Sequence, residues 1–169
     1  MAIYSVVPLV CVIAYGVLSI IVARHLSTRT RRLFAVYLLL CLIFAIGTYM
    51  ALSNSETGHL RFWASLLPIG SISVLVAYYH FVSAFIHTSN RLLVILGYGF
   101  VLFALIPLAA LGYLPQNVQL TDAGLDIDYG AFLYMISIIG SILVGLSIFL
   151  MVRRLRVIHH PTERGRIIY

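Results

Sequence analysis

The sequence predicts an all-α, polytopic membrane bundle of five transmembrane helices, and three observations support this fold class. Of the 169 residues, 62% are hydrophobic and only 9% are charged, whereas a soluble domain carries about 25% charged residues. The mean hydropathy is +1.06. Five apolar runs contain no Asp, Glu, Lys or Arg, and each has the roughly 20 residues that a helix needs to cross the hydrocarbon of a bilayer. A soluble globular protein is therefore excluded.

The five apolar runs define the expected helices in chain order: about 3–23, 33–52, 64–86, 92–111 and 131–152. Helices are expected because an open sheet would leave backbone groups unpaired in lipid. The first run has no basic residue before it and is followed directly by Arg24, so we interpret it as a retained helix and not as a cleaved signal peptide. Residues 1–169 then form a single membrane domain, in which residues 153–169 are a basic cytoplasmic tail.

The arginines predict the orientation of the bundle. All eleven Lys+Arg residues are arginines, and Arg61 is the one that falls in the second or fourth link. The other ten lie in the first link, the third link and the tail: Arg24, Arg29, Arg31, Arg32, Arg91, Arg153, Arg154, Arg156, Arg164 and Arg166. Basic residues accumulate on the cytoplasmic side. We therefore expect a multi-pass protein of the inner (plasma) membrane, with its N-terminus outside and its C-terminus in the cytoplasm.

The positive charge also indicates which partners to expect. A net charge of +6 favours contact with the anionic lipid head groups of the bilayer. Nucleic acid is not an expected partner, because the arginines flank apolar spans. The absence of lysine excludes a retinal Schiff base, which requires one.

The one substantial outer link, between residues 112 and 130, predicts a small extracellular β-hairpin at about 117–129. Apolar and polar residues alternate on both sides of Asp122-Ala123-Gly124, and alternation around a short Gly-containing loop is typical of a hairpin. We expect the apolar face to pack on the helix ends and Gly124 to supply a positive-φ turn position.

Polar residues on the third helix form a candidate polar seam. Together with Val76 between the first two, Ser73, His80, Ser83 and His87 recur at spacings of three and four, so they share one stripe of the helix. One interpretation is that the seam binds or transports a ligand, since polar groups in a span usually face the interior of the bundle. The alternative, which we favour, is a neutral histidine hydrogen-bonded to a neighbouring helix.

Small residues on the fifth helix form a candidate helix-packing face. Ser137, Ser141 and Gly145 repeat at intervals of four, and such a face lets another helix approach closely. We favour packing within the same bundle over a homodimer contact. Cys11 and Cys41 both lie in apolar runs and are expected to be buried thiols rather than a disulfide.

The sequence offers no motif for catalysis or for a cofactor. His80 and His87 lie on one helix and the other spans contain no histidine, whereas a transverse haem takes axial ligands from facing helices. Asp122, Asp126 and Asp128 do not match the spacing of a calcium loop. We expect no catalytic residue, no metal site and no cofactor.

The order of these features resembles the N-terminal seven-helix membrane region of bacterial sensor histidine kinases, which also precedes diguanylate cyclase domains. The resemblance includes the Arg-rich first inner link, the tight third link from His87 to Arg91, and the outer link ending in Asp128-Tyr-Gly130. It continues through Arg153-Arg154-Leu-Arg156 and Glu163-Arg-Gly-Arg-Ile-Ile-Tyr169. The resemblance covers essentially the whole chain, but the chain contains only five of the family's seven helices. We therefore interpret the chain as a fragment of a longer protein.

The resemblance implies a signal-input module that relays a stimulus to a cytoplasmic kinase or cyclase domain in the parent protein. It carries no catalytic residue into this region, and no residue here identifies the ligand. The alternative is a small transporter or channel subunit, which is disfavoured because no carboxylate lies in a span. A third hypothesis is that the chain is a structural partner in a membrane complex.

Overall fold

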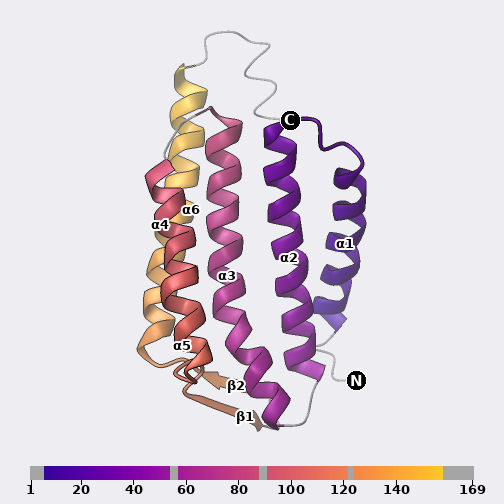
Figure 1. Ribbon diagram of the computed structural model, residues 1–169, viewed down its shortest axis with the longest axis vertical. Helices are drawn as coiled ribbons and strands as arrows, with labels where there is room; N and C mark the ends of the chain where they lie inside the picture. The colour runs from indigo at the N-terminus through magenta and orange to yellow at the C-terminus, as the bar shows by residue number, and fades with distance from the viewer. Residues whose placement is uncertain (1–5, 54–56, 88–90, 122–123, 158–169) are drawn as a thin grey trace.

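The computed structural model describes residues 6–53, 57–87, 91–121 and 124–157. It confirms the all-α class: five helical stretches in this part of the chain are long and apolar enough to cross a membrane, and the one sheet found there has two strands. In chain order (Figure 1), the elements are α1 (Val6–Ala23), α2 (Arg29–Ser53), α3 (Thr57–Phe85), α4 (Arg91–Phe100), η2 (Val101–Leu105), α5 (Ile106–Ala110), β1 (Asn117–Thr121), β2 (Gly124–Asp128) and α6 (Ala131–Val157).

The helices run side by side, so that the bundle has two distinct ends (Figure 1). The link between α1 and α2, the start of α4 and the last turn of α6 lie at one end, which we call the Arg-rich end. The described arginines gathered there are Arg24, Arg29, Arg31, Arg32, Arg91, Arg153, Arg154 and Arg156. The two strands lie at the opposite end, which we call the hairpin end.

Three helices extend beyond the apolar runs from which they were predicted. α2 begins at Arg29 and α3 at Thr57, while α6 continues to Val157. At the start of α2, the side-chain oxygen of Thr28 accepts a hydrogen bond from the backbone N–H of Arg31 at 3.3 Å, which is an N-cap. The apolar runs therefore mark the parts of the helices that fit the hydrocarbon, and polar turns extend the helices past it.

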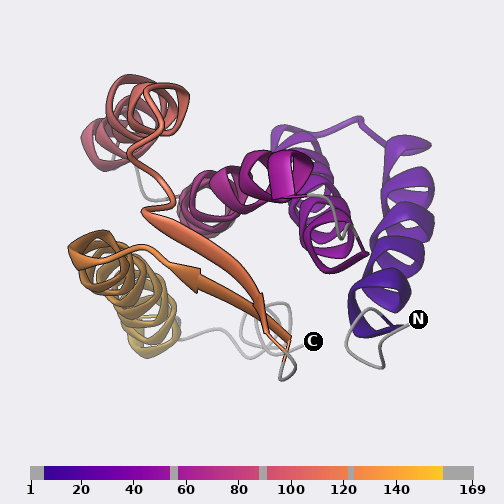
Figure 2. The ribbon, with the colours of Figure 1, turned by 90° about the horizontal axis from the view of Figure 1, so that it is seen from below.

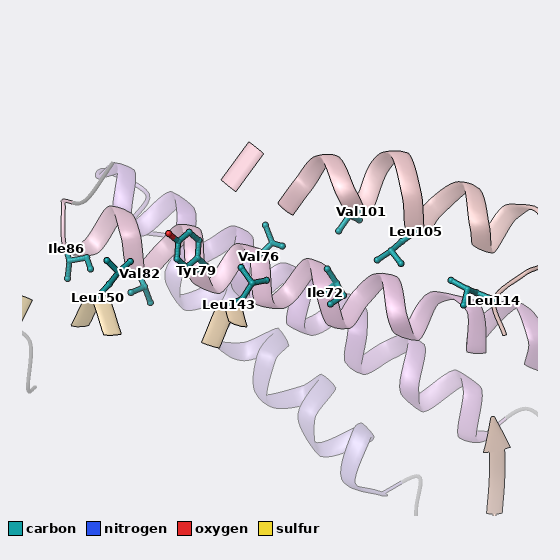
Figure 3. Close-up of a cluster of buried hydrophobic side chains, with 10 residues drawn as sticks. All are labelled: Ile72, Val76, Tyr79, Val82, Ile86, Val101, Leu105, Leu114, Leu143 and Leu150. Carbon is teal, nitrogen blue, oxygen red and sulfur yellow. The ribbon is translucent and has the colours of Figure 1, made fainter. Parts of the chain in front are cut away.

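The core of the bundle is built around α3. This helix packs against α2, α4, η2, α5, α6 and β1. Its buried side chains recur every three or four residues and pack against buried side chains of η2 and α6. Figure 3 shows this hydrophobic cluster, which consists of Ile72, Val76, Tyr79, Val82, Ile86, Val101, Leu105, Leu114, Leu143 and Leu150. α3 is thus the central helix of the bundle, and it contacts more of the other elements than any other helix does.

Aromatic rings fill the interface between α2 and α3. Phe34 packs on Phe81 with ring centroids 5.2 Å apart, and Tyr37 packs on Tyr78 at 5.8 Å. By contrast, α1 packs on α2 and has no buried residue of its own. The bundle is therefore well packed from α2 to α6, and α1 lies at its periphery.

The fourth span is a single stretch that changes helix type at its centre. α4 passes into the π-helical segment η2 and then into α5, where the N–H of Ile106 donates to the carbonyl of Val101. Pro107 lies in the first turn of α5. Because proline has no N–H and its ring collides with the preceding turn, a local change of hydrogen-bond pattern before it relieves the collision. Pro107 was the one sequence signal for this irregularity.

The hairpin prediction is confirmed in its pairing. β1 and β2 are antiparallel, Asn117 pairs with Asp128, and Val118 pairs with Ile127. Val118 and Ile127 are half-buried and β1 packs on α3, while Gln119 and Asp126 are exposed. Seen from the hairpin end in Figure 2, the two strands cross the end of the bundle from the α5 and α6 side.

The turn of the hairpin differs from the prediction. Gly124 is paired with Thr121 and is the first residue of β2, so it belongs to the strand and not to the turn. The connection consists of residues 122 and 123, which lie outside the described residues. The expectation of a three-residue turn was therefore wrong by one residue, because a two-residue connection extends the ladder to Gly124.

Candidate functional site

The hairpin end is fastened to α3 through Tyr129, the residue that follows β2 by one position. Its hydroxyl donates a hydrogen bond of 2.8 Å to the carbonyl of Ala64, a residue of α3 that is fully buried. Burial of the ring raises the pKa of Tyr129 to about 12, because the charged phenolate would lose its hydration. The neutral phenol therefore connects the end of the hairpin to the first third of α3.

The outer arginine makes a second connection between α3 and this end of the chain. Arg61 donates from Nη2 to the carbonyl of Gly112 at 3.0 Å. Gly112 has a φ of +78°, a conformation that favours glycine because it has no Cβ. In the sequence, Arg61 stands out only as an exception to the charge pattern. Its isolation on that side was the signal that could have marked it as a structural contact.

The base of the hairpin is held together by its own backbone and by one carboxylate. The N–H of Gln116 donates to the carbonyl of Asp128 at 2.9 Å, and the N–H of Gly130 donates to Oδ1 of Asp128 at 2.7 Å. Gly130 has a φ of +53°, and a Cβ there would lie 2.6 Å from Oε1 of Gln116. The buried pair Leu114 and Pro115 precedes this base. The hairpin is thus docked on the bundle end and leads directly into α6.

The candidate polar seam on α3 divides into buried and exposed members. Ser83 is 3% exposed, Ser73 and His80 are half-buried, and His87 is exposed just past the end of α3 with a φ of 56°. The hydroxyl of Ser73 donates to the carbonyl of Ile69 at 2.7 Å. The four residues therefore do not form one continuous interior stripe, and His80 and Ser83 are the pair that reaches the interior.

The favoured reading of His80 was a hydrogen bond to a neighbouring helix. The ring of His80 does meet a neighbouring helix, because it lies edge-on to Tyr98 of α4 with centroids 6.0 Å apart. Its Nδ1 is nevertheless buried without a hydrogen-bond partner among the described residues, as is Oγ of Ser83. The role of the seam stays a prediction.

The candidate helix-packing face on α6 points away from the other helices. Ser137, Ser141 and Gly145 are all exposed, and nothing in the described chain lies within 4 Å of a Cβ built on Gly145. This corrects the expectation that the face packs within the same bundle. A role in contacting a helix outside the described chain stays a prediction.

The face of α6 that does pack contains Gly140, Leu143, Ser147 and Leu150, all of them buried. A Cβ on Gly140 would lie 3.0 Å from Cδ1 of Leu75 on α3. This face was not predicted from the sequence, although Gly140 and Ser147 are small residues seven positions apart. Both faces of α6 carry small residues, so their presence alone did not identify the buried face.

At the Arg-rich end, two arginines hold the link between α1 and α2 in place. Arg31 donates from Nη1 to Oγ of Ser27 at 3.2 Å and to the carbonyl of His25 at 3.5 Å. Arg32 donates from Nε to the carbonyl of Leu26 at 3.2 Å. These arginines therefore satisfy carbonyls that follow α1, in addition to the charge that they bring to this end.

The two cysteines lie in α1 and α2, and α2 contains further polar side chains. Both are free thiols, and Cys41 is buried as expected, whereas Cys11 is only half-buried, so the expectation of a buried thiol was wrong for Cys11. The side chain of Cys41 is hydrogen-bonded to Tyr37, one turn earlier on α2. The hydroxyl of Thr48 donates to the carbonyl of Phe44 at 2.9 Å. Thr48 and Cys41 therefore have their partners within α2.

Comparison with known proteins gives one match. The model of a family described as the N-terminal 7TM region of histidine kinase matches residues 7–168. Searches of curated proteins and of solved structures found no match. The matched range covers nearly the entire sequence, including all five spans and the hairpin that packs on α3. This chain belongs to the family of N-terminal seven-transmembrane regions of histidine kinases.

Proposed function

We propose that this bundle is the signal-input module of a sensor histidine kinase, and that it relays a stimulus from the hairpin end to a cytoplasmic output domain through α6. One observation carries the proposal: α6 is a single 27-residue helix from Ala131 to Val157 that joins the docked hairpin to the Arg-rich end. A continuous helix transmits displacement or rotation along its length. The family membership supports the sensor role.

The hairpin end is the proposed receiving part of the module. Its contacts reach both helices of the relay, because Tyr129 bonds to α3 at Ala64 while Gly130 and Asp128 form the junction with α6. A stimulus that favours a different seating of the hairpin would therefore change how α6 lies on α3. Such a shift requires that the stimulus bind or stabilise one arrangement more strongly than the other.

The interface between α3 and α6 is the proposed moving contact. α3 is the helix on which α6 packs most extensively. Apart from Ser147, whose hydroxyl is bonded within its own helix to Leu143, the buried residues of α6 at this interface are aliphatic side chains and Gly140. Packed apolar surfaces without hydrogen bonds between the helices permit a small slide or rotation without breaking directional bonds.

The proposed orientation places the N-terminus outside and the Arg-rich end in the cytoplasm. Eight described arginines gather at one end of the bundle, whereas Arg61 is the described arginine of the hairpin end. The positive-inside tendency favours this arrangement. The end of α6 would then lie at the cytoplasmic face, and the two further helices of the seven-helix family would carry the signal on to a kinase or cyclase domain of the parent protein.

A helical phase scan tests the relay. In the full-length parent kinase, one to four alanines are inserted after Val157. If α6 transmits its rotation, autophosphorylation in lipid vesicles should rise and fall with a period of about 3.6 inserted residues. Insertion of the same alanines into the flexible part of the kinase core serves as the control. Activity that is constant or declines steadily with insert length would refute the relay through α6.

A further inference from the structure

Two buried polar atoms lie about one turn apart on α3, and the residue that carries the first of them, His80, meets α4. They are Nδ1 of His80 and Oγ of Ser83, and neither has a hydrogen-bond partner among the described residues. A spacing of three residues places the two side chains on the same face of the helix. The two atoms therefore belong to one face of α3.

The surroundings of this pair are closed by α4. The ring of Tyr98 stands edge-on to the ring of His80 at an interplanar angle of 72°. One turn away from His80, Val76 lies so close to Gly97 of α4 that a Cβ on the glycine would be 2.9 Å from both Cγ atoms. Ser83 is buried, with only 3% of its surface exposed. Lipid does not reach the two polar atoms.

The hydroxyl of Ser83 differs from those of three other residues in the spans, although it shares its lack of a partner in the described part of the chain with Ser19 of α1. Ser73, Ser147 and Thr48 each donate to the carbonyl four residues earlier, at 2.7, 2.8 and 2.9 Å. Such a bond within the helix is the usual way for a buried serine to be satisfied in a membrane span. A buried polar group without any partner costs roughly 5- to 150-fold in the folding equilibrium. Two such groups side by side therefore call for a common partner.

We propose that Nδ1 of His80 and Oγ of Ser83 together bind a water molecule between α3 and α4. Water both donates and accepts hydrogen bonds, so it complements either tautomer of the imidazole and either rotation of the hydroxyl. Buried water in proteins typically bonds to about three otherwise unsatisfied polar groups. His80 is only half-buried, so we expect the molecule to exchange with its surroundings at the exposed part of this side chain.

The proposed water lies beside the irregular part of the fourth span. η2 begins at Val101, within one turn of Tyr98. π-helical turns often accompany functional sites, and inserted water is one recognised cause of helix bending. The water makes the α3–α4 contact polar and exchangeable, in contrast to the aliphatic contact between α3 and α6. This inference stands independently of the relay through α6, because it concerns hydration and not kinase output.

The test is magnetic resonance on the chain in lipid nanodiscs with ¹⁵N-labelled histidine rings. The resonances of His80 are assigned by their loss in His80→Gln. We expect direct transfer of magnetisation from water to the His80 ring in the parent chain. The transfer should disappear in Ser83→Ala and persist in Ser73→Ala, a matched control on the same helix whose hydroxyl is already bonded to Ile69. No transfer in the parent, or equal transfer in Ser83→Ala, would overturn the proposal.

The sign of a stability change gives a second, independent measurement. If the hydroxyl of Ser83 had no partner, Ser83→Ala would remove an unsatisfied group and raise the thermal midpoint. With bound water, the substitution removes a satisfied hydrogen bond and strands the water, so the midpoint should fall. A raised midpoint would overturn the proposal. If Ser83→Ala does not fold, the water transfer to His80 in the parent chain still decides the outcome.

Discussion

Tyr129 is the residue whose single hydrogen bond most directly fastens the hairpin to the bundle. Replacing it in Tyr129→Phe removes the donor to the carbonyl of Ala64 and keeps the ring. We expect a loss of about 1 kcal/mol in the free energy of unfolding, the ordinary worth of one such bond. Thermal unfolding in detergent micelles measures it. An unchanged midpoint would show that the bond contributes nothing to docking.

The raised pKa of Tyr129 also predicts a pH dependence with a definite sign. The folded state holds the phenol neutral to about pH 12, whereas an exposed tyrosine ionises near its ordinary pKa of 10.0. The contribution of Tyr129 is therefore complete below pH 10 and is lost as the pH rises toward 12, since only the unfolded state releases its proton in that range. The stability difference between the parent and Tyr129→Phe should shrink over this window, and a difference that grew would contradict the burial.

Gly97 of α4 lies in close contact with Val76 of α3. A methyl group in Gly97→Ala would collide with both branches of Val76, so we expect a loss of about 1–3 kcal/mol through overpacking. The double variant Gly97→Ala, Val76→Ala should recover part of the loss. Gly99→Ala, two residues along, is the matched control, because nothing lies within 4 Å of its added Cβ. Equal effects of Gly97→Ala and Gly99→Ala would contradict the close contact.

At the scale of elements, the sequence predicted which segments exist but not which way each helix faces. The length of an apolar run and the alternation around Asp122 are one-dimensional signals, and they located the five spans and the hairpin. The face of α6 has no such signal. Buried Leu143 and Leu150 alternate with exposed Ile142 and Phe149, because lipid accepts the same side chains as the interior of the bundle.

The same reasoning explains which candidate residues were recognised. His80 and Ser83 stood out because polar groups are rare in spans, and in the structure each has a buried polar atom without a hydrogen-bond partner among the described residues. Tyr129 and Arg61 were not singled out as contacts, because their partners are backbone carbonyls at Ala64 and Gly112. A carbonyl is present at every residue, so sequence alone gives no indication of which one a side chain will reach.

The orientation of α6 leads to a prediction that reverses the one from sequence. The spacing of Ser137, Ser141 and Gly145 implied that a large side chain at Gly145 would destabilise the bundle. Because this face is exposed, Gly145→Leu should change the stability of the chain by no more than about 0.5 kcal/mol.

Gly140→Leu is the matched comparison on the opposite face of α6. Its side chain would meet Leu75, since a Cβ alone would already lie 3.0 Å from Cδ1. We expect a loss of about 1–3 kcal/mol, measured by thermal unfolding of both variants in the same micelles. A larger loss for Gly145→Leu than for Gly140→Leu would show that the small-residue face is an intimate contact of the bundle.

For the whole molecule, the distribution of charge and the fold agree on two chemically different ends. The exposed carboxylates of Asp126 and Asp128 lie in the hairpin, and the one described arginine at that end is bonded to the carbonyl of Gly112. At the other end, Arg31 and Arg32 stabilise the α1–α2 link as well as adding charge. Folding of the link and the positive-inside tendency therefore favour the same placement of these arginines.

This asymmetry predicts which end a reagent outside the cell can reach. In a chain whose native thiols are removed by Cys11→Ala and Cys41→Ala, Gln119→Cys places a thiol on the exposed hairpin and His25→Cys places one in the α1–α2 link. A membrane-impermeant maleimide applied to intact cells should label Gln119→Cys, and it should label His25→Cys only after permeabilisation. Ten arginines on the side of His25 would have to cross the bilayer for the reverse pattern to occur, which the cost of moving arginine through hydrocarbon opposes. Labelling of His25→Cys in intact cells would therefore overturn the orientation, and with it the direction in which α6 carries a signal.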